Sequence, residues 1–490
     1  MRKDNIILGI ILVVGFFLRV WHLDLMEFKQ DEAFACLKAT HIANFSEFPL
    51  AGLKSSVGIH NPPLFIYLMA VPFIFSRNPL AGAFFVVLMN TITILLTYKL
   101  ANKLFNKKTA LISSSLFAFS PWTVIYSRKI WAQDFLPFFT LVFLLVVLEF
   151  LIDNKPKQIL WILIFLACLV QIHFSGIAGV FFLILTCWVV KPKFNKKYLF
   201  VGLMIVLFLF LPYLVFQYKN NFEDLRNFVQ SFSEGIYKEN FSVRPVFFYF
   251  LTNINCGNFQ YLIGNYSEKF YSQLSFFNFV NYLEIILFLA GLIFCICKLF
   301  IKDKNKKNFL ILVIWLLTPI FLLIFIRIRI YPHYLVIQYP VQFILVAIFL
   351  DSLQKFFRKK GTAIIITITF FILCSNVFSI FKFYELIDEL GGAPGDYGTS
   401  YKFKNQAIRY ILTKSQGIPQ TVKDITPDKK LSLEYQYLIQ YNSRIMFGVA
   451  VQKSTKQFFI LDTFRFGSSK KTNVFPMRSF GPVYVYTIFD

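Results

Sequence analysis

The chain has 490 residues, of which 57% are hydrophobic and 16% are charged, and its formal net charge is +24. A water-soluble core does not need so much apolar surface, whereas repeated passages through a bilayer do. The Lys and Arg residues lie in short clusters between apolar runs, and such clusters set the orientation of membrane helices. The positive net charge therefore does not indicate nucleic acid as a partner.

The first apolar run, residues 6–20, follows two basic residues, and no small-residue cleavage site comes after it. We therefore expect an uncleaved signal anchor with its N-terminus in the cytoplasm. A first outer loop, residues 21–79, follows and contains the adjacent carboxylates Asp31 and Glu32. A short apolar helix at 62–76 either spans the membrane or lies at the interface. We expect it on the outer face, because the later Lys and Arg clusters then agree with one another.

Ten further apolar runs fit membrane spans, which gives about eleven transmembrane helices in a domain of residues 1–383. A large outer loop, residues 217–275, is too long to be a simple turn. The ten runs are residues 80–100, 110–126, 135–151, 159–170, 176–190, 198–216, 277–299, 309–326, 335–350 and 363–381.

The composition changes from about residue 384, and we expect a small extracytoplasmic α/β domain at 384–490. Residues 391–398 are rich in Gly and are typical of a turn-rich linker. Hydrophobic periodicity predicts a helix at 402–413 and short strands at 445–451, 457–461 and 482–489.

This topology places many polar and charged residues on the outer face, whereas the inner loops carry mainly lysines. A charge in the middle of a bilayer costs about 2.5–3.5 kcal/mol on insertion scales, so we expect these groups to line a water-filled outer cavity. The outer residues include Asp31, Glu32, Asp134, Arg128, Lys129, Arg327, Arg329, Tyr331, His22, His41, His60, His173 and His333.

These residue types suit transfer from a phosphate leaving group to a hydroxyl. A carboxylate can act as a general base towards a hydroxyl, and an arginine fork can hold two phosphate oxygens. Simpler roles remain open, since Arg128 or Arg327 can anchor a helix end at the headgroups. Equally, His173 can be a satisfied interfacial histidine and His60 a helix cap.

Four short motifs occur in a characteristic order: Asp31-Glu32, His60-Asn61-Pro62-Pro63-Leu64, Tyr126-Ser127-Arg128 followed by Asp134, and Tyr331-Pro332-His333-Tyr334. In their order and spacing, the chain resembles the GT-C membrane glycosyltransferases. The similar branch contains the protein O-mannosyltransferases and the lipid A aminoarabinose transferase. The resemblance covers roughly residues 1–350.

The resemblance implies an enzyme of the plasma membrane that moves a sugar from a polyprenyl-phosphate carrier to a hydroxyl of a cell-envelope lipid, glycan or protein. It implies Asp31 as the general base, with Glu32 in support and Asp134 near the acceptor or the base. No metal is expected, although a divalent cation such as Mg or Mn remains an option. A lipid or glycan flippase or transporter, an O-antigen ligase or polymerase, and a non-catalytic scaffold are the alternatives.

The candidate site therefore has three parts. The candidate catalytic residues are Asp31, Glu32 and Asp134, and the candidate donor-phosphate residues are Arg128, Arg327, Arg329, Tyr331 and His333. The candidate pocket residues are His60, Asn61 and His173. Besides the donor, the expected partners are membrane lipids and the acceptor.

Overall fold

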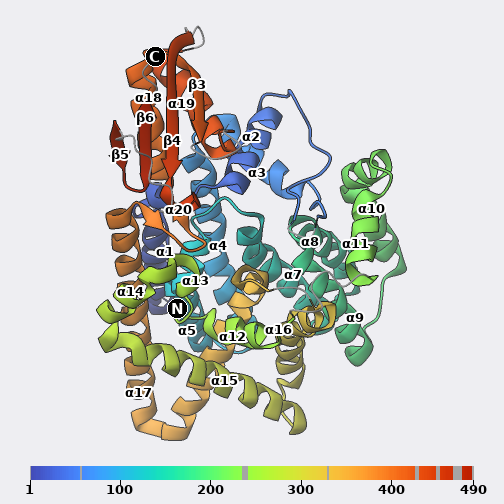
Figure 1. The fold of residues 1–490 in the computed structure, drawn as a ribbon. Helices are drawn as coiled ribbons and strands as arrows, with labels where there is room; N and C mark the ends of the chain where they lie inside the picture. Colours follow the sequence, from blue (N-terminus) through green and yellow to red (C-terminus); the bar gives the residue numbers. More distant parts are fainter. Residues whose placement is uncertain are drawn as a thin grey trace.

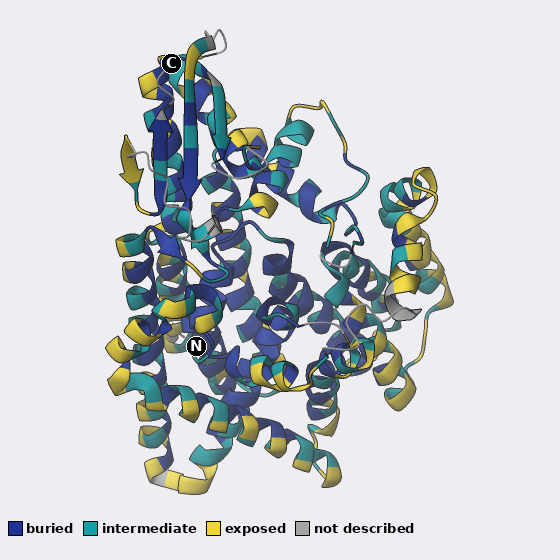
Figure 2. Cartoon of the chain, viewed as in Figure 1, coloured by how far each residue is buried: buried dark blue, intermediate teal, exposed yellow. Residues whose placement is uncertain are grey.

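A bundle of long apolar helices with a small sheet at one end makes up the molecule (Figure 1). The computed structural model describes residues 2–55, 58–233, 241–327, 330–424, 430–448, 453–466 and 477–487. Figure 2 shows that buried residues fill the middle of the bundle, while α10 (Lys196–Lys219) presents an exposed surface. Because this apolar helix is exposed, it is suited to contact lipid.

The predicted apolar runs coincide with helices in the structure. These helices are α1 (Arg2–Val20), α4 (Pro79–Leu104), α5 (Lys107–Phe119), α6 (Pro121–Tyr126), α7 (Leu136–Leu151), α8 (Ile159–Ile172), α9 (Ala178–Val190), α10, α15 (Asn278–Phe300), α16 (Lys306–Ile326) and α17 (Tyr339–Leu390). Among the described residues, seven helices are long and apolar enough to cross a membrane. The exact number of eleven spans stays a prediction.

Two of the predicted spans differ from a simple straight helix. The run at 110–126 is divided at Ser120–Pro121 into α5 and α6, because proline cannot continue the hydrogen bonding of a helix interior. The runs at 335–350 and 363–381 both lie in α17, where Arg358 has a φ of 47° and turns the chain back (Figure 1). Each of the two runs therefore occupies its own arm of α17.

The first outer loop contains η1 (Leu23–Leu25), α2 (Gln30–Ala43) and α3 (Leu64–Phe75). With its 12 residues, α3 is about 18 Å long at 1.5 Å per residue, well short of a bilayer core of about 30 Å. This length favours the predicted interfacial position. The large outer loop is mostly helical, with α11 (Glu223–Ser233), α12 (Arg244–Thr252), α13 (Gln260–Ile263) and α14 (Ser267–Gln273).

Loops that were predicted to face the cytoplasm meet at one end of the bundle. Lys103 Nζ lies 2.6 Å from Asp153 Oδ2, and Asn106 Nδ2 donates to Asp351 Oδ2 at 3.2 Å. Lys107 Nζ lies 3.9 Å from Asp4 Oδ2. Since the start of α1, the α4–α5 connection, the α7–α8 connection and the first arm of α17 meet here, their assignment to one common side agrees with the fold.

The tail after α17 forms an α/β unit, as predicted. Its sheet has the order β3-β4-β6-β5, with β3 parallel to β4 and the other pairs antiparallel. The linker forms a small hairpin of β1 and β2. The elements are β1 (Gly392–Ala393), β2 (Gly398–Thr399), α18 (Tyr401–Ser415), β3 (Ile418–Asp424), α19 (Leu433–Phe447), β4 (Lys453–Asp462), α20 (Thr463–Phe466), β5 (Arg478–Phe480) and β6 (Val483–Thr487).

The predicted strand at 445–451 is wrong for its first three residues, which are the end of α19. Tyr435, Leu438 and Asn442 are buried at helical spacing, so the apolar run from 445 continues a helix rather than starting a strand. Gly448, with a φ of 74°, follows its last residue. Residues 449–451 lie outside the described part of the chain.

Candidate functional site

A cavity of about 310 Å³ lies among the first outer loop, the α6–α7 connection, the segment before α17 and the tail hairpin. Six of the predicted site residues line it: Asp31, Glu32, Asn61, His173, Tyr331 and His333. The other lining residues are Lys29, Leu53, Lys54, Ser55, Lys129, Trp131, Ala132, Gln133, Tyr261, Tyr334 and Asp396. The cavity thus combines carboxylates, lysines and aromatic rings from segments that are distant in sequence.

Asp31 lies in the first turn of α2 with an exposed side chain at the cavity. Among the described residues, no partner forms a hydrogen bond or an ion pair with its carboxylate. The positive end of the helix dipole favours a negative charge at this position. Asp31 therefore presents an ionisable, unpaired carboxylate to whatever enters the cavity.

Glu32, by contrast, is buried and holds the start of α2. Its Oε2 accepts a hydrogen bond from the backbone N–H of Lys29 at 2.8 Å, which closes the helix end. Its Oε1 lies 3.8 Å from Lys129 Nζ. Burial outweighs the nearby lysine and raises the pKa of Glu32 to about 7. Glu32 is therefore engaged with the backbone of Lys29 and with Lys129 at the start of α2.

A buried charge network forms the cavity floor, and it was missing from the predicted site. Lys129 Nζ lies 2.8 Å from Glu27 Oε2, and Lys29 forms a second, close ion pair with Glu27. Burial raises the pKa of Glu27, but the two lysines outweigh it and lower the pKa overall. Burial lowers the pKa of Lys129, but Glu27 and Glu32 outweigh it and raise the pKa overall. The position of Lys129 directly after the Tyr-Ser-Arg motif was the only sequence signal for this network.

Aromatic rings form one wall of the cavity. The ammonium group of Lys129 lies 3.8 Å from the ring centre of Trp131, and the Trp131 ring contacts His333 edge-on at 4.4 Å between centroids. Tyr331 stacks on the other side of His333 at 5.6 Å. In the described chain His333 Nδ1 is buried and has no hydrogen-bond partner. This atom is therefore a candidate donor or acceptor for a bound molecule.

The tail hairpin contributes Asp396, a second residue that the sequence did not indicate. Its backbone oxygen accepts a hydrogen bond from Lys29 Nζ at 2.5 Å, and its Oδ1 lies 3.7 Å from the same nitrogen. Its backbone N–H donates to the oxygen of Tyr261 at 2.9 Å. Burial and the nearby Glu27 raise the pKa of Asp396. The C-terminal unit thus takes part in the cavity directly.

Two of the predicted residues are buried outside the cavity lining. The guanidinium of Arg128 donates to the backbone oxygens of His22 at 2.5 Å and Leu18 at 3.4 Å, and it lies over the ring of Tyr384. These contacts give Arg128 a structural role. Asp134 lies in η2 (Ala132–Phe135), next to Gln133, and its carboxylate is buried and finds no partner among the described residues.

Two further predicted residues, His60 and Arg327, do not line the cavity. His60 Nδ1 lies 3.0 Å from Asp224 Oδ1, so this side chain ties the first outer loop to α11. Arg327 is exposed at the C-terminal end of α16. Arg329 lies outside the described residues. Within the described segments, no group of three or more His, Cys, Asp or Glu side chains is arranged to hold a metal ion.

Comparisons with known proteins agree with this architecture. A model of the dolichyl-phosphate-mannose-protein mannosyltransferase family matches residues 60–216. The structure of this chain is similar to a crystal structure of ArnT from Cupriavidus metallidurans bound to undecaprenyl phosphate, with a TM-score of 0.60 and 10% sequence identity. The match covers 99% of this chain and 97% of the ArnT chain. The chain therefore has a fold like that of ArnT. The predicted resemblance is therefore confirmed.

Two other proteins share less of their length with this chain. Archaeal oligosaccharyltransferase AglB from Archaeoglobus fulgidus, in complex with an inhibitory peptide and a dolichol-phosphate, matches 90% of this chain over 60% of its own, at 12% identity and a TM-score of 0.50. An uncharacterized protein of Aquifex aeolicus (strain VF5) is 25% identical over 363 residues. That match covers 72% of this chain and 65% of the relative, so the chain spans less than two thirds of its length.

Proposed function

We propose that the chain is an inverting glycosyltransferase that moves a sugar from a polyprenyl-phosphate carrier to a hydroxyl group at the outer face of the membrane. The observation that carries this proposal is the exposed, unpaired carboxylate of Asp31 beside a cavity with lysines and aromatic rings. The ArnT structure contains bound undecaprenyl phosphate and the AglB structure contains a dolichol-phosphate, which supports the same donor class here.

In the proposed step, the hydroxyl oxygen of the acceptor attacks the anomeric carbon from the face opposite to the phosphate. The hydroxyl proton moves to the Asp31 carboxylate as the new C–O bond forms. The bond between the anomeric carbon and the phosphate oxygen breaks, and its electron pair leaves with the polyprenyl phosphate. Atoms and charge balance without an oxidant or a reductant.

The departing phosphate needs positive charge, and the cavity suggests a different source from the predicted arginines. Lys54 lines the cavity with a half-exposed side chain, and its nearest carboxylate, on Glu223, lies 3.8 Å away. Lys129 is already paired with Glu27 and Glu32. We therefore assign the leaving phosphate to Lys54, with the unpaired Nδ1 of His333 as a hydrogen-bonding partner.

The proposed chemistry requires no metal ion, because carboxylate and lysine supply the base and the charge. Transfer in membranes treated with EDTA should then equal transfer in untreated membranes. Restored activity on adding back Mg²⁺ or Mn²⁺ after a loss would contradict this part of the proposal.

Mass spectrometry of cell-envelope glycans and polyprenyl-phosphate sugars tests the function in cells. Cells without the gene should lack one glycosylated product and accumulate its polyprenyl-phosphate sugar. Complementation with the wild-type gene should restore both levels, whereas Asp31→Asn should restore neither at equal protein level. Unchanged envelope glycans in the deleted strain would contradict the proposal, and an altered distribution of the lipid alone would favour a flippase.

A further inference from the structure

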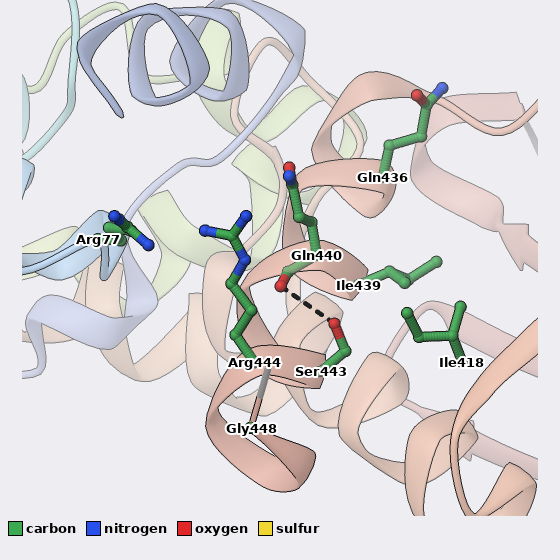
Figure 3. Close-up of a pocket in the computed structure, with 8 residues that line it drawn as sticks. All are labelled: Arg77, Ile418, Gln436, Ile439, Gln440, Ser443, Arg444 and Gly448. Carbon is green, nitrogen blue, oxygen red and sulfur yellow. Dashed lines mark hydrogen bonds between the residues drawn. The ribbon is translucent and has the colours of Figure 1, made fainter. Parts of the chain in front are cut away.

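A second hollow surface lies far along α2 from Asp31, between the α3–α4 corner and tail helix α19 (Figure 3). It consists of two adjoining hollows of about 720 and 500 Å³, which share Arg77, Gln440 and Arg444. We call this surface the arginine groove. Its lining includes His41, in the last turn of α2.

The two arginines of the groove lack a carboxylate partner within the described chain. Arg77 Nη2 donates to the side-chain oxygen of Asn44 at 2.5 Å, and no described residue bonds to the guanidinium of Arg444. Figure 3 shows the guanidinium of Arg444 extending towards Arg77. Among the residues that the structure describes, no Asp or Glu lines either hollow. Two uncompensated guanidiniums that face one space are the groups that best hold a phosphate.

Glu47, in the loop after α2, already forms ion pairs with residues of α2. Glu47 pairs with His41 at 2.9 Å and with Lys38 at 2.5 Å, and these two contacts lower its pKa. It therefore stays ionised and bound to those partners. The net charge of the groove remains positive.

The protein holds this corner rigidly. Tyr437 on α19 donates a hydrogen bond from its hydroxyl to the backbone oxygen of Arg77 at 2.7 Å. Tyr401 on α18 donates to the side-chain oxygen of Asn78 at 3.2 Å, and that same oxygen accepts from the N–H of Leu80 at the start of α4. These contacts between the tail and the membrane domain hold the backbone of Arg77 against α19, so the two arginines already stand on neighbouring elements before binding.

The groove also lies beside the start of a helix that is long and apolar enough to cross a membrane. Arg77 comes two residues before Pro79, the first residue of the spanning helix α4. Apolar side chains around it point into the surroundings, with Phe75 85% and Phe45 83% exposed. Ile74, Phe48 and Ile445 are also exposed nearby in the chain. Exposed aromatic and aliphatic side chains beside arginines are typical of the boundary between headgroups and acyl chains.

We propose that the arginine groove binds the phosphate of an anionic membrane lipid, whose acyl chains lie along the exposed apolar side chains. The site is separate from the cavity: Asp31 and His41 are ten residues apart on α2, or about 15 Å at 1.5 Å per residue. A lipid held here anchors the tail against the bilayer while the cavity stays free. The proposal does not depend on the proposed glycosyl transfer.

Native mass spectrometry of the purified full-length protein, titrated with dioleoyl phosphatidylglycerol, tests the proposal. Wild type should retain one lipid that Arg77→Gln/Arg444→Gln binds at least about tenfold more weakly, because the variant loses the charge-assisted hydrogen bonds to the phosphate. Arg226→Gln/Arg244→Gln removes the same charge from exposed positions on the large outer loop and should bind as wild type does. Equal affinity in wild type and the groove variant would overturn the proposal.

Two further measurements distinguish a lipid phosphate from free phosphate and control for misfolding of the double variant. Inorganic phosphate alone should neither displace the lipid nor bind comparably; if it does, the site is a free-phosphate site and the lipid assignment fails. Arg444→Gln alone removes a side chain without a bond in the described structure, so this variant should fold normally and still lose affinity. Wild-type lipid binding by this folded variant would likewise overturn the proposal.

Discussion

The ammonium group of Lys29 donates a hydrogen bond of 2.5 Å to the backbone oxygen of Asp396, although 367 residues separate them. Lys29 precedes α2, which carries Asp31, and Asp396 lies in the turn of the tail hairpin. The hydroxyl of Tyr397 donates to the backbone oxygen of Leu25 at 2.6 Å and ties the same two segments. The C-terminal unit is therefore fastened to the loop that holds the proposed base.

Replacing the Asp396 side chain should weaken the reaction without releasing the tail. In Asp396→Ala the backbone contacts with Lys29 and Tyr261 remain, while the cavity loses a carboxylate. We expect kcat/KM for transfer to fall about tenfold, which corresponds to roughly 1.4 kcal/mol. Asp388→Ala, which removes a half-exposed carboxylate paired with Lys402, should leave kcat/KM unchanged. An unaltered kcat/KM in Asp396→Ala would show that its side chain does not act on the substrate.

Lys129 should be essential for stability, because it compensates two buried carboxylates. In Lys129→Met, Glu27 and Glu32 lose their shared partner, and removing one member of a buried pair costs about 3–5 kcal/mol. Unfolding in detergent micelles measures this loss. The double variant Lys129→Met/Glu27→Gln should lose less than Lys129→Met alone. Lys155→Met removes an exposed ion pair and should cost below about 1 kcal/mol.

The raised pKa of Glu32 predicts a pH dependence of stability. Its pKa is about 7 in the folded chain and 4.5 ordinarily, so between these values the folded state binds more protons than the unfolded state. The contribution of Glu32 to the free energy of unfolding is fully present below about pH 4.5 and is lost as the pH rises through about 7. This contribution is roughly 3 kcal/mol at most.

Glu32→Gln isolates this effect and keeps an acceptor for the backbone N–H of Lys29. From pH 5 to pH 8 the Tm of wild type should fall relative to that of Glu32→Gln, as measured by thermal unfolding in one detergent. Parallel pH profiles for the two proteins would contradict the burial of an ionisable Glu32.

The side of the membrane can be tested at Asn106, between α4 and α5. This loop contacts Asp351 and lies at the same end of the bundle as Asp4 and Asp153. A fluorescent reporter that folds only in the cytoplasm should fluoresce when fused after Asn106. The same reporter fused to the C-terminus should stay dark. Fluorescence from the C-terminal fusion alone would invert the assignment of sides, and the cavity would then open to the cytoplasm.

Much of the fold could be predicted because the signal for membrane helices is local. A sufficiently long run of apolar residues by itself predicts a membrane-spanning helix. Residues 80–100 and 309–326 could therefore be recognised without any tertiary information. The strand predicted at 445–451 is wrong at residues 445–447 for a related reason. A short apolar run fits both periods, and the buried residues of the preceding helix decide which one applies.

The site was only partly predictable, because its charge network depends on distant contacts. Asp31 was identified by its position after a membrane span, and it does line the cavity. Nothing near Asp396 in sequence indicates that it meets Lys29 across 367 residues. Arg128 was predicted to bind the donor phosphate, whereas in the structure its two Nη atoms donate to the backbone oxygens of Leu18 and His22. A residue type suggests a chemistry, but its partners determine whether that chemistry is available.

The most direct test of the proposed base is the transfer rate of Asp31→Asn, measured with purified protein in vesicles and a radiolabelled polyprenyl-phosphate sugar. Loss of a general base should lower the rate at least about 100-fold, while donor binding stays unchanged. Asp24→Asn changes a half-exposed carboxylate of the same outer loop that does not line the cavity, and this variant should transfer at the wild-type rate. Transfer by Asp31→Asn at the wild-type rate would contradict the account.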